Sequence, residues 1–308
     1  MRGEGDRTPR VSVIMRCKNS DWVIHHALAA LRGQRFRDWE LIVIDSGSTD
    51  RTLEIVRAHG ARLVEIPPED YFPGRVLNLG ARLARGELLV FQNSDGVPLG
   101  PDALGRLVAA FDDPAVEAAL GRQVPRPGAP GWVRREYAAS FPEAAEAAPW
   151  ITLSMPFAAV RRSAWEAHPF YTDAWASEDT EWGLRARRRG AKIAYVKDAL
   201  VMHSHDYTLR QGWGRRFVEG EADAFLRARP TPAWRVMARA LRGAAADARA
   251  ACGRDGALGE LPKDLARRAV DAVAWARGHR LGWRRRRRGD ADARLGQRTA
   301  IATHPSRR

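Results

Sequence analysis

Apolar and polar positions alternate between two kinds of segment in the first hundred residues. Short apolar runs, rich in β-branched residues and typical of buried strands, occupy residues 11–16, 39–45, 61–67 and 87–95. Between the first three runs, residues 21–31 and 53–56 carry apolar side chains at helical spacing. This alternation predicts an α/β domain with a parallel sheet covered on both faces, in which ligands gather at the carboxyl ends of the strands.

Polar side chains follow three of these predicted strands. They are Arg16, Cys17, Lys18 and Asn19 after the first strand, Asp45 at the end of the second, and Gln92, Asn93, Ser94 and Asp95 at the end of the fourth. Asp45 directly follows its apolar run, where a carboxylate commonly accepts hydrogen bonds from a nucleotide base or ribose. Asp50 stands just before a predicted helix, so we interpret it as a capping residue.

Composition supports a folded protein with an uneven charge. The chain has 308 residues, 45% of them hydrophobic, and a formal net charge of +14. The residues from 221 onward contain 21 Lys and Arg against 9 Asp and Glu, so nearly all of the excess lies there. We therefore expect a near-neutral main domain, which does not fit a nucleic-acid-binding protein, followed by a basic segment.

The first ten residues are polar and no apolar run is long enough to span a bilayer, so we expect a cytoplasmic protein. Its two cysteines, Cys17 and Cys252, cannot form a disulfide framework or a four-cysteine zinc site.

Five segments together resemble a known family. They are VSVIMRCKNSDWVIHHALAALRGQ, WELIVIDSGSTDRT, RVLNLGARLARGELLVFQNSDGVP, GRQVPRPGAPGWVRREYAASFP and SEDTEWGLRARRRGAKIAYVKDALVMHSH. In order and spacing they are similar to the family 2 glycosyltransferases with the GT-A fold, in particular the rhamnosyltransferase-like branch, over about residues 10–220. Pattern reading alone stops at an α/β nucleotide-binding domain.

The resemblance implies a Rossmann-like GT-A domain over residues 1–225, with a donor half at about 10–100 and an acceptor half at about 120–220. A basic helical extension with a flexible end would follow over residues 226–308. The implied activity is inverting transfer of a sugar from a nucleotide-diphosphate-sugar donor to a hydroxyl of a glycan, lipid-linked sugar or small polyol. The alternative is a non-catalytic or weakly catalytic nucleotide-sugar-binding subunit.

The family holds a divalent cation with a DxD element after the fourth strand, and here that element reads Asn93, Ser94, Asp95. The resemblance therefore places Mg²⁺ or Mn²⁺ on Asp95, where the cation would neutralise the departing diphosphate. His203, in the HSH that follows the strand-like residues 199–202, is the second expected ligand. With one carboxylate missing, a metal-independent variant stabilised by Arg or Lys remains an alternative, as does a plain turn.

In the segment SEDTEWGLR the resemblance assigns the general base to Asp179, with Glu178 beside it. Both residues also suit the start of the helix that we predict over residues 180–189. Trp182, one turn after Asp179, is the expected acceptor contact, because sugars stack on aromatic rings. The expected donor contacts are Arg16, Lys18, Asn19, Asp45, Arg75, Asn78, Asn93 and Ser94.

The basic segment is rich in helix formers and is interrupted by Pro230, Pro232 and Pro262, which predicts two or three helices. Between residues 265 and 283 Trp and Arg are interleaved, and five arginines follow at 284–288. Such a helix could lie on an anionic membrane, on the inner face next to a lipid-linked acceptor. The alternatives are a helix docked on the main domain with a disordered arginine tail, and RNA binding.

Overall fold

The computed structural model of the protein describes residues 8–253 and 258–301. The chain forms two compact units, each assembled from several stretches. The first contains Met1–Pro127, Glu136–Phe170 and Asp179–Ser204, and the second contains Gly128–Arg135, Tyr171–Glu178 and His205–Arg308. The division that we expect after residue 225 stays a prediction.

The first unit alternates strands and helices, as the apolar pattern predicts. Its elements are β1 (Val11–Cys17), α1 (Ile24–Arg32), β2 (Trp39–Asp45), α2 (Thr52–Ala58), β3 (Arg62–Glu65), η1 (Pro68–Asp70), α3 (Pro73–Leu83), β4 (Leu88–Asn93), β5 (Val97–Pro98), α4 (Ala103–Ala109), η2 (Ala110–Asp112), β6 (Val116–Val124), β7 (Phe157–Arg161), α6 (Arg162–Ala167), α7 (Glu178–Arg188) and β8 (Lys192–Met202). Helix α5 (Gly131–Ser140) and the first residue of α7 include stretches assigned to the second unit.

The strands form one mixed sheet in the order β3-β2-β1-β4-β7-β6-β8-β5. The four strands β3, β2, β1 and β4 run parallel, whereas β7 is antiparallel to both β4 and β6. The register pairs Cys17 with Asp45 and Arg16 with Asn93. The carboxyl ends of β1, β2 and β4 therefore lie at the same edge of the sheet.

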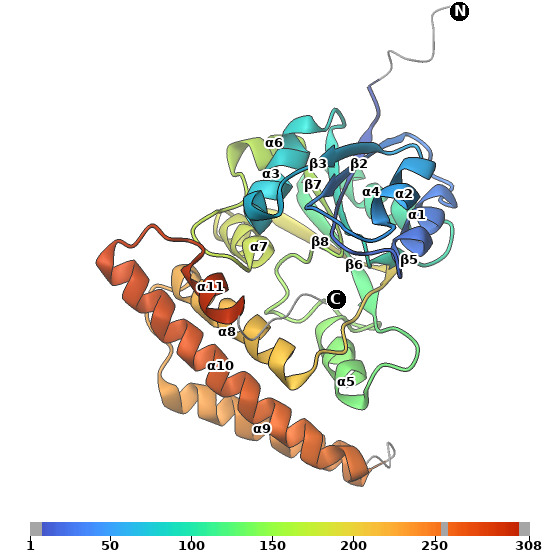
Figure 1. The fold of residues 1–308 in the computed structure, drawn as a ribbon. Coiled ribbons are helices and arrows are strands. Elements are labelled where there is room, and N and C mark those ends of the chain that lie inside the picture. The colour runs from blue at the N-terminus through green and yellow to red at the C-terminus, as the bar shows by residue number, and fades with distance from the viewer. Residues whose placement is uncertain (1–7, 254–257, 302–308) are drawn as a thin grey trace, which may run out of the picture. The chain divides into compact units, whose positions relative to one another are not determined.

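Helices cover both faces of this sheet, because successive side chains of each strand point to opposite faces. On one face Ile14 and Phe91 pack with buried residues of α3, α6 and α7. On the other face Val13 and Val90 pack with α1 and α4, and Met15 and Val43 pack with α1 and α2. Figure 1 shows these two groups of helices on opposite sides of the strands. The expected α/β sheet with helical layers on both faces is confirmed.

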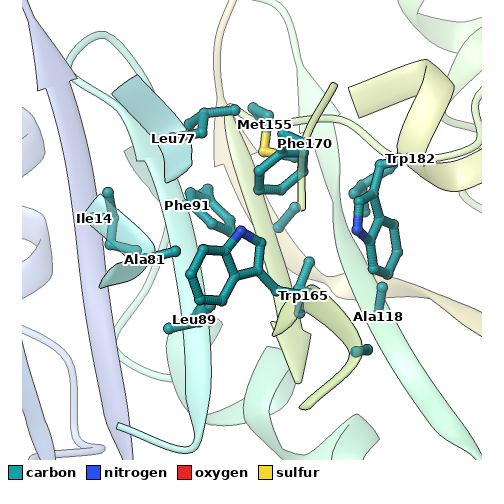
Figure 2. Close-up of a cluster of buried hydrophobic side chains, with 14 of the residues drawn as sticks. Ile14, Leu77, Ala81, Leu89, Phe91, Ala118, Met155, Trp165, Phe170 and Trp182 are labelled. Carbon is teal, nitrogen blue, oxygen red and sulfur yellow. The ribbon is translucent and has the colours of Figure 1, made fainter. Parts of the chain in front are cut away.

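The first of these faces has an aromatic centre, shown in Figure 2. The rings of Phe91 and Phe170 meet edge to face with their centroids 5.2 Å apart. Trp182 lies next to Phe170 and is only 1% exposed, and its indole N–H donates to the carbonyl of His168 (2.7 Å). Burying side chains of this size stabilises the fold by about 2 kcal/mol each.

The second unit is helical. Its described helices include α8 (Leu209–Leu226), α9 (Ala233–Cys252), η3 (Leu258–Glu260), α10 (Leu261–Arg288) and α11 (Leu295–Ile301). Pro232 directly precedes α9, and Pro262 lies in the first turn of α10, where a missing backbone N–H costs little. The expectation of two or three helices after residue 226 is confirmed for the described residues.

Helices α8 and α10 approach each other closely at glycines. A Cβ atom on Gly220 of α8 would lie 2.9 Å from two backbone carbons of Trp275, and one on Gly278 of α10 would lie 2.8 Å from the carbonyl carbon of Phe217. Gly282 likewise faces α8, at the backbone of Glu221. Only residues without a side chain allow the two backbones this separation.

The five arginines at 284–288 are not a disordered tail. They form the end of α10, which stops at Gly289 in the left-handed conformation (φ 64°). Arg285 is buried, pairs with the buried Glu221 and stacks on Phe225, and Arg286 donates to the carbonyls of Ala224 and Arg227. The end that we expect to be flexible, residues 302–308, lies outside the described residues.

None of the helices in the described ranges 8–253 and 258–301 is both long enough and apolar enough to cross a lipid bilayer.

Candidate active site

Polar residues gather at the edge of the sheet where β1, β2 and β4 end, as predicted. Asn19, in the left-handed region (φ 46°), accepts a hydrogen bond from the backbone of Thr49 (2.8 Å). Its own backbone N–H donates to Ser48 (2.8 Å). The loops after β1 and β2 are therefore tied together. Arg16 lies half-buried in β1, and Lys18 beside it is exposed.

Asp45 supports this edge from inside. It is 1% exposed, and one carboxylate oxygen accepts the backbone N–H groups of Gly47 (2.9 Å) and Ser48 (2.8 Å). The other oxygen accepts the Ser48 hydroxyl and the Cys17 thiol (3.4 Å). This carboxylate accepts four hydrogen bonds and is almost fully buried, so it shapes the loop of residues 46–49. Its expected nucleotide contact stays a prediction.

Cys17 is a buried thiol at the same place. Burial, and then the neighbouring Asp45 carboxylate, raise the pKa of the Cys17 thiol well above its usual range. The side chain is therefore protonated at neutral pH, and its hydrogen bond to Asp45 is structural. Asp50 accepts hydrogen bonds from the backbone of Thr52 (3.0 Å) and Asp21 (3.1 Å), in agreement with its interpretation as a residue of the helix start.

The turn after β4 carries Asn93, Ser94 and Asp95. Its backbone is fixed by the hydrogen bond from Gly96 N–H to the Asn93 carbonyl (2.9 Å). The hydroxyls of Ser94 and Ser20 lie 2.9 Å apart, which links this turn to the loop after β1. Asn93 is half-buried and Ser94 is buried. Their positions at this edge agree with the sequence analysis, and their donor contacts stay predictions.

Asp95 lies beside His203. Strand β5 pairs with the end of β8, with Val97 opposite Met202, and this register brings the turn after β4 next to the residue that follows β8. The distance from Asp95 Oδ1 to His203 Nε2 is 3.7 Å, and both side chains are largely buried. The two residues that we predict as metal ligands are therefore neighbours.

The other ring nitrogen of His203, Nδ1, is positioned by contacts with Gln123 and Tyr137. It lies 3.0 Å from Oε1 of Gln123 and 3.2 Å from the hydroxyl of Tyr137. Gln123 is oriented by its own bond to Ser154 (2.7 Å). Because Oε1 can only accept, the hydrogen of neutral His203 belongs on Nδ1, and Nε2 faces Asp95 as a lone-pair donor.

Arg126 also reaches Asp95. Its Nη2 donates to the Asp95 carbonyl (3.1 Å) and lies 3.5 Å from the Oδ2 of the carboxylate. The guanidinium stacks on the ring of Trp22, 4.6 Å from its centroid. A fixed positive charge therefore stands next to the carboxylate. Gln123 in β6, Arg126 just after it and Tyr137 in α5 were not predicted as site residues, although all three lie in the segment GRQVPRPGAPGWVRREYAASFP, whose resemblance to the family was the available signal.

Two further predicted site residues, Asp179 and Arg75, lie elsewhere in the first unit, and a third, Glu178, lies in the second. Asp179 lies in the first turn of α7, half-buried, and its carboxylate accepts the backbone N–H of Thr180 (2.6 Å). Arg75 lies exposed in the first turn of α3, with its guanidinium 5.3 Å from the ring centroid of Phe72. Glu178 is buried and belongs to the second unit. Their predicted roles stay predictions.

Asn78 and Trp182 lie in the core of the first unit. The side-chain amide of Asn78 donates to the Phe170 carbonyl (2.8 Å) and accepts from the Trp165 indole (2.9 Å) and the Phe170 backbone (3.0 Å). These hydrogen bonds hold the Asn78 side chain in the core, and its donor contact stays a prediction. Trp182 belongs to the same core, and its acceptor contact likewise stays a prediction.

Comparison with known proteins identifies a family and close fold relatives. The family described as glycosyl transferase family 2 matches residues 12–176. The chain is 28% identical over 226 residues to the O-antigen chain rhamnosyltransferase RfbN of Salmonella typhimurium, covering 68% of this chain and 71% of that protein. It is 31% identical over 205 residues to the O-antigen chain rhamnosyltransferase WbaN of Salmonella anatum, covering 62% and 64%.

Two solved structures have a similar fold. The mannosyltransferase PcManGT of Pyrobaculum calidifontis, solved in complex with GDP-Man and Mn²⁺, has a TM-score of 0.63 and 22% identity, over 89% of this chain and 88% of that one. TarS 1-349 of S. aureus has a TM-score of 0.55 and 18% identity, over 91% and 92%.

Proposed function

Because the chain belongs to glycosyl transferase family 2, in its rhamnosyltransferase-like branch, and has the GT-A fold, we propose that it transfers a sugar from a nucleotide-diphosphate-sugar donor to a hydroxyl group, with inversion at the anomeric carbon. The observation that carries this proposal is the pair of Asp95 and His203 at the carboxyl edge of the sheet, 3.7 Å apart. Ligands of open α/β sheets bind at this edge.

The relatives narrow the substrates to be tried first. RfbN and WbaN are named O-antigen chain rhamnosyltransferases, so a nucleotide-activated rhamnose is the first donor to test. The same names favour a growing glycan, carried on a lipid or free, as the acceptor. PcManGT was solved with GDP-Man, and TarS with UDP-GlcNAc, so guanine and uracil donors belong in the panel, and thymine donors are added because the sequence does not identify the base.

The residues present fit a divalent cation. A carboxylate oxygen and an imidazole nitrogen point to one place, and Gln123 fixes the ring of His203 so that its lone pair faces Asp95. Mg²⁺ or Mn²⁺ bound there would neutralise charge on the departing diphosphate. PcManGT was solved with Mn²⁺, which supports a divalent cation at this site.

Arg126 supplies a second positive charge at this place. In the structure it contacts Asp95 through the backbone carbonyl and the carboxylate. A guanidinium pairs well with phosphate oxygens, so we propose that Arg126 binds the diphosphate together with the cation. It would compensate for the amide of Asn93, which stands where the family has a carboxylate. Arg16, Lys18, Asn93 and Ser94 are the proposed neighbours of the donor.

We assign the general base to Asp179, with Glu178 as its neighbour in the sequence. Asp179 would take the proton of the acceptor hydroxyl as that oxygen attacks the anomeric carbon and the bond to the diphosphate breaks. A single displacement of this kind inverts the anomeric configuration and needs no protein nucleophile. The thiol of Cys17 fits this proposal, since its raised pKa and its burial keep it protonated.

Thermal shift with a panel of nucleoside diphosphates tests the donor site. We expect the cognate diphosphate to raise the melting temperature more with Mn²⁺ than with chelator, because a ligand at about 100 times its dissociation constant adds roughly 2.7 kcal/mol of stability. Asp95→Asn should lose the Mn²⁺-dependent part. Asp112→Asn, which changes an exposed carboxylate that pairs with Arg10, should keep it.

Transfer to an acceptor is measured in parallel with the release of nucleoside diphosphate from NDP-rhamnose. Activity that persists in full with excess chelator would remove the cation from the proposal. Donor binding without any transfer, across the panel of acceptors, would favour the nucleotide-sugar-binding subunit instead.

A further inference from the structure

Helix α9 exposes a stripe of large apolar side chains. Trp234, Met237 and Leu241 are spaced by three and four residues, which puts them on one face of the helix. They are 65%, 61% and 63% exposed, among the most exposed large apolar side chains of the described chain. Ala245 continues the same face by one more turn.

A different face of α9 holds the helix in its unit. Asp247 is 1% exposed, receives hydrogen bonds from Arg268 of α10 (3.0 Å from its Nη2) and pairs with Arg135 (3.1 Å). Burial raises the pKa of Asp247, but the hydrogen bonds and charges of the two arginines outweigh it and hold that pKa below its usual range. Ala251, one turn later, is buried as well. The fold therefore uses the inner face, and the stripe serves no packing role within its unit.

The exposed charges of α9 all have one sign. The helix carries the exposed arginines Arg235, Arg239, Arg242 and Arg249. Its single acidic residue, Asp247, is buried and paired with Arg135 and Arg268. Arg235, Arg242 and Arg249 recur every seven residues, so they line one side of the stripe. The surface is thus apolar in its middle and cationic along its edge.

The tryptophans of α10 suggested a membrane helix in the sequence analysis. In the structure, Trp275 and Trp283 of this helix contact His279 within the same unit. The ring of Trp275 stacks on that of His279 with centroids 4.6 Å apart, and Trp283 donates from its indole to His279 Nε2 (3.0 Å). Arg285 is buried against Glu221. Figure 1 shows α9 running beside α10, with its other side turned away from that helix.

From these observations we infer that α9 is an interfacial membrane helix, whose stripe of Trp234, Met237 and Leu241 inserts at the boundary between headgroups and acyl chains of an anionic bilayer. A helix with Trp and Leu on one face and Arg beside them binds in the plane of such an interface. The arginines contact lipid phosphates, and each basic group near the surface strengthens binding about fivefold.

The positive charge of α9 argues against two other binding partners, a second copy of the chain and RNA. A second copy of the chain, docked stripe to stripe, offers the arginines no acidic partner on α9, because the exposed charges of that helix are all positive. RNA would satisfy the arginines, but it would leave the three large apolar side chains in water. An anionic bilayer satisfies both parts of the surface, and it needs no spanning helix.

Co-sedimentation of the full chain with vesicles tests the inference without donor or acceptor, so its result does not depend on the proposed activity. We expect binding to vesicles that contain phosphatidylglycerol, weaker binding at high salt, and little binding to pure phosphatidylcholine. Trp234→Ser combined with Met237→Ser and Leu241→Ser should weaken binding at least tenfold. Trp150→Ser, which removes another exposed tryptophan, is the matched control and should bind as the unmodified chain does.

The arginines are tested in the same way. Changing Arg235, Arg242 and Arg249 to Gln should weaken binding on the order of 100-fold. The charge-matched control changes the exposed α10 residues Arg280, Arg284 and Arg288 to Gln. This variant should bind vesicles less than about tenfold more weakly than the unmodified chain.

Insertion itself has a separate measurement. On addition of anionic vesicles the tryptophan emission should shift to shorter wavelength, and Trp234→Phe should remove most of that shift.

Any of five results overturns the inference, the first four of which concern vesicle binding and oligomeric state. These are no binding of the full chain to anionic vesicles, equal binding by the apolar triple variant, equal losses in the two arginine variants, and a dimer in light scattering that the apolar variant converts to a monomer. An RNA complex that competes fully with vesicles and is insensitive to the apolar variant would also contradict it.

Discussion

Replacing Gly220 with alanine measures how much the close approach of α8 and α10 contributes to stability. The added Cβ would lie 2.9 Å from two backbone carbons of Trp275 and closer still to its carbonyl oxygen. A backbone carbonyl inside a helix cannot rotate away, so the helices must separate by roughly 1 Å, and contacts along their interface lose between a quarter and a half of their dispersion energy.

The expected size of the effect follows from two opposing terms. Overpacking of a close interface costs about 1–3 kcal/mol, and a site against rigid backbone belongs at the upper end. Alanine gains about 1 kcal/mol over glycine in helix propensity. We therefore expect Gly220→Ala to lower the free energy of unfolding by roughly 2 kcal/mol.

Gly212 gives a control within the same helix. A Cβ there would come no closer than 3.6 Å to the carboxylate of Asp271, which is an ordinary contact. Gly212→Ala should therefore stabilise the protein by about 0.5–1 kcal/mol through propensity alone. Urea denaturation followed by far-ultraviolet circular dichroism gives the midpoints of both variants. The reasoning fails if Gly220→Ala is as stable as the unmodified chain, or if both variants are destabilised alike.

Three further predictions concern charged and polar groups. Asp179→Asn should lower turnover roughly 100-fold or more while diphosphate binding changes little, and Glu178→Gln should lower it less, as steady-state kinetics and thermal shift would show. Burial raises the pKa of Glu221 to about 7 in spite of its arginine partner, so its protonation favours the folded state below its unfolded pKa, and this contribution is lost as the pH rises through 7. Unfolding free energies between pH 4.5 and 8 should accordingly fall with rising pH, with a shallower slope in Glu221→Gln. Gln123→Leu should weaken Mn²⁺-dependent nucleotide binding roughly 10-fold to 100-fold by releasing the ring of His203, and unchanged Mn²⁺ affinity in calorimetry would contradict the orienting role.

The parallel half of the sheet could be predicted because its strands are buried on both faces. Such strands appear as continuous apolar runs, and β1, β2 and β4 were all found in this way. Strands β6 and β7 were not predicted. The short β7 (Phe157–Arg161) follows a long stretch without a regular pattern and inserts between β4 and β6, and pairing between distant segments leaves no local trace in the sequence.

The sequence predicted where most site residues lie along the sheet edge, but it predicted less well which way their side chains point. Asn93, Asp95 and His203 follow strands that end at the same edge of the sheet, so the backbone alone brings them together. Their positions could therefore be predicted from the apolar pattern and the resemblance. The burial of Asn78 and Trp182 could not be predicted, because a motif gives the place of a residue along a helix, whereas the packing of other segments decides whether it faces the core. Arg126, which contacts Asp95, was not predicted, because the resemblance of its segment did not single out this residue and the loop after β6 has no regular apolar pattern.

The interleaving of the two units bears on how the polypeptide is made. The second unit takes Gly128–Arg135 and Tyr171–Glu178 from the middle of the chain and all of its long helices from the residues after Ser204. During synthesis those two early stretches leave the ribosome well before α8, α9 and α10 exist.

Arg135 illustrates the delay, since both of its described carboxylate partners, Asp247 and Asp264, lie more than a hundred residues further on. The second unit is therefore not a detachable C-terminal module. Cutting the gene after Ser204 would strand two segments without the helices that complete their unit, and a chaperone that shields nascent chains would have to cover them until translation is nearly finished.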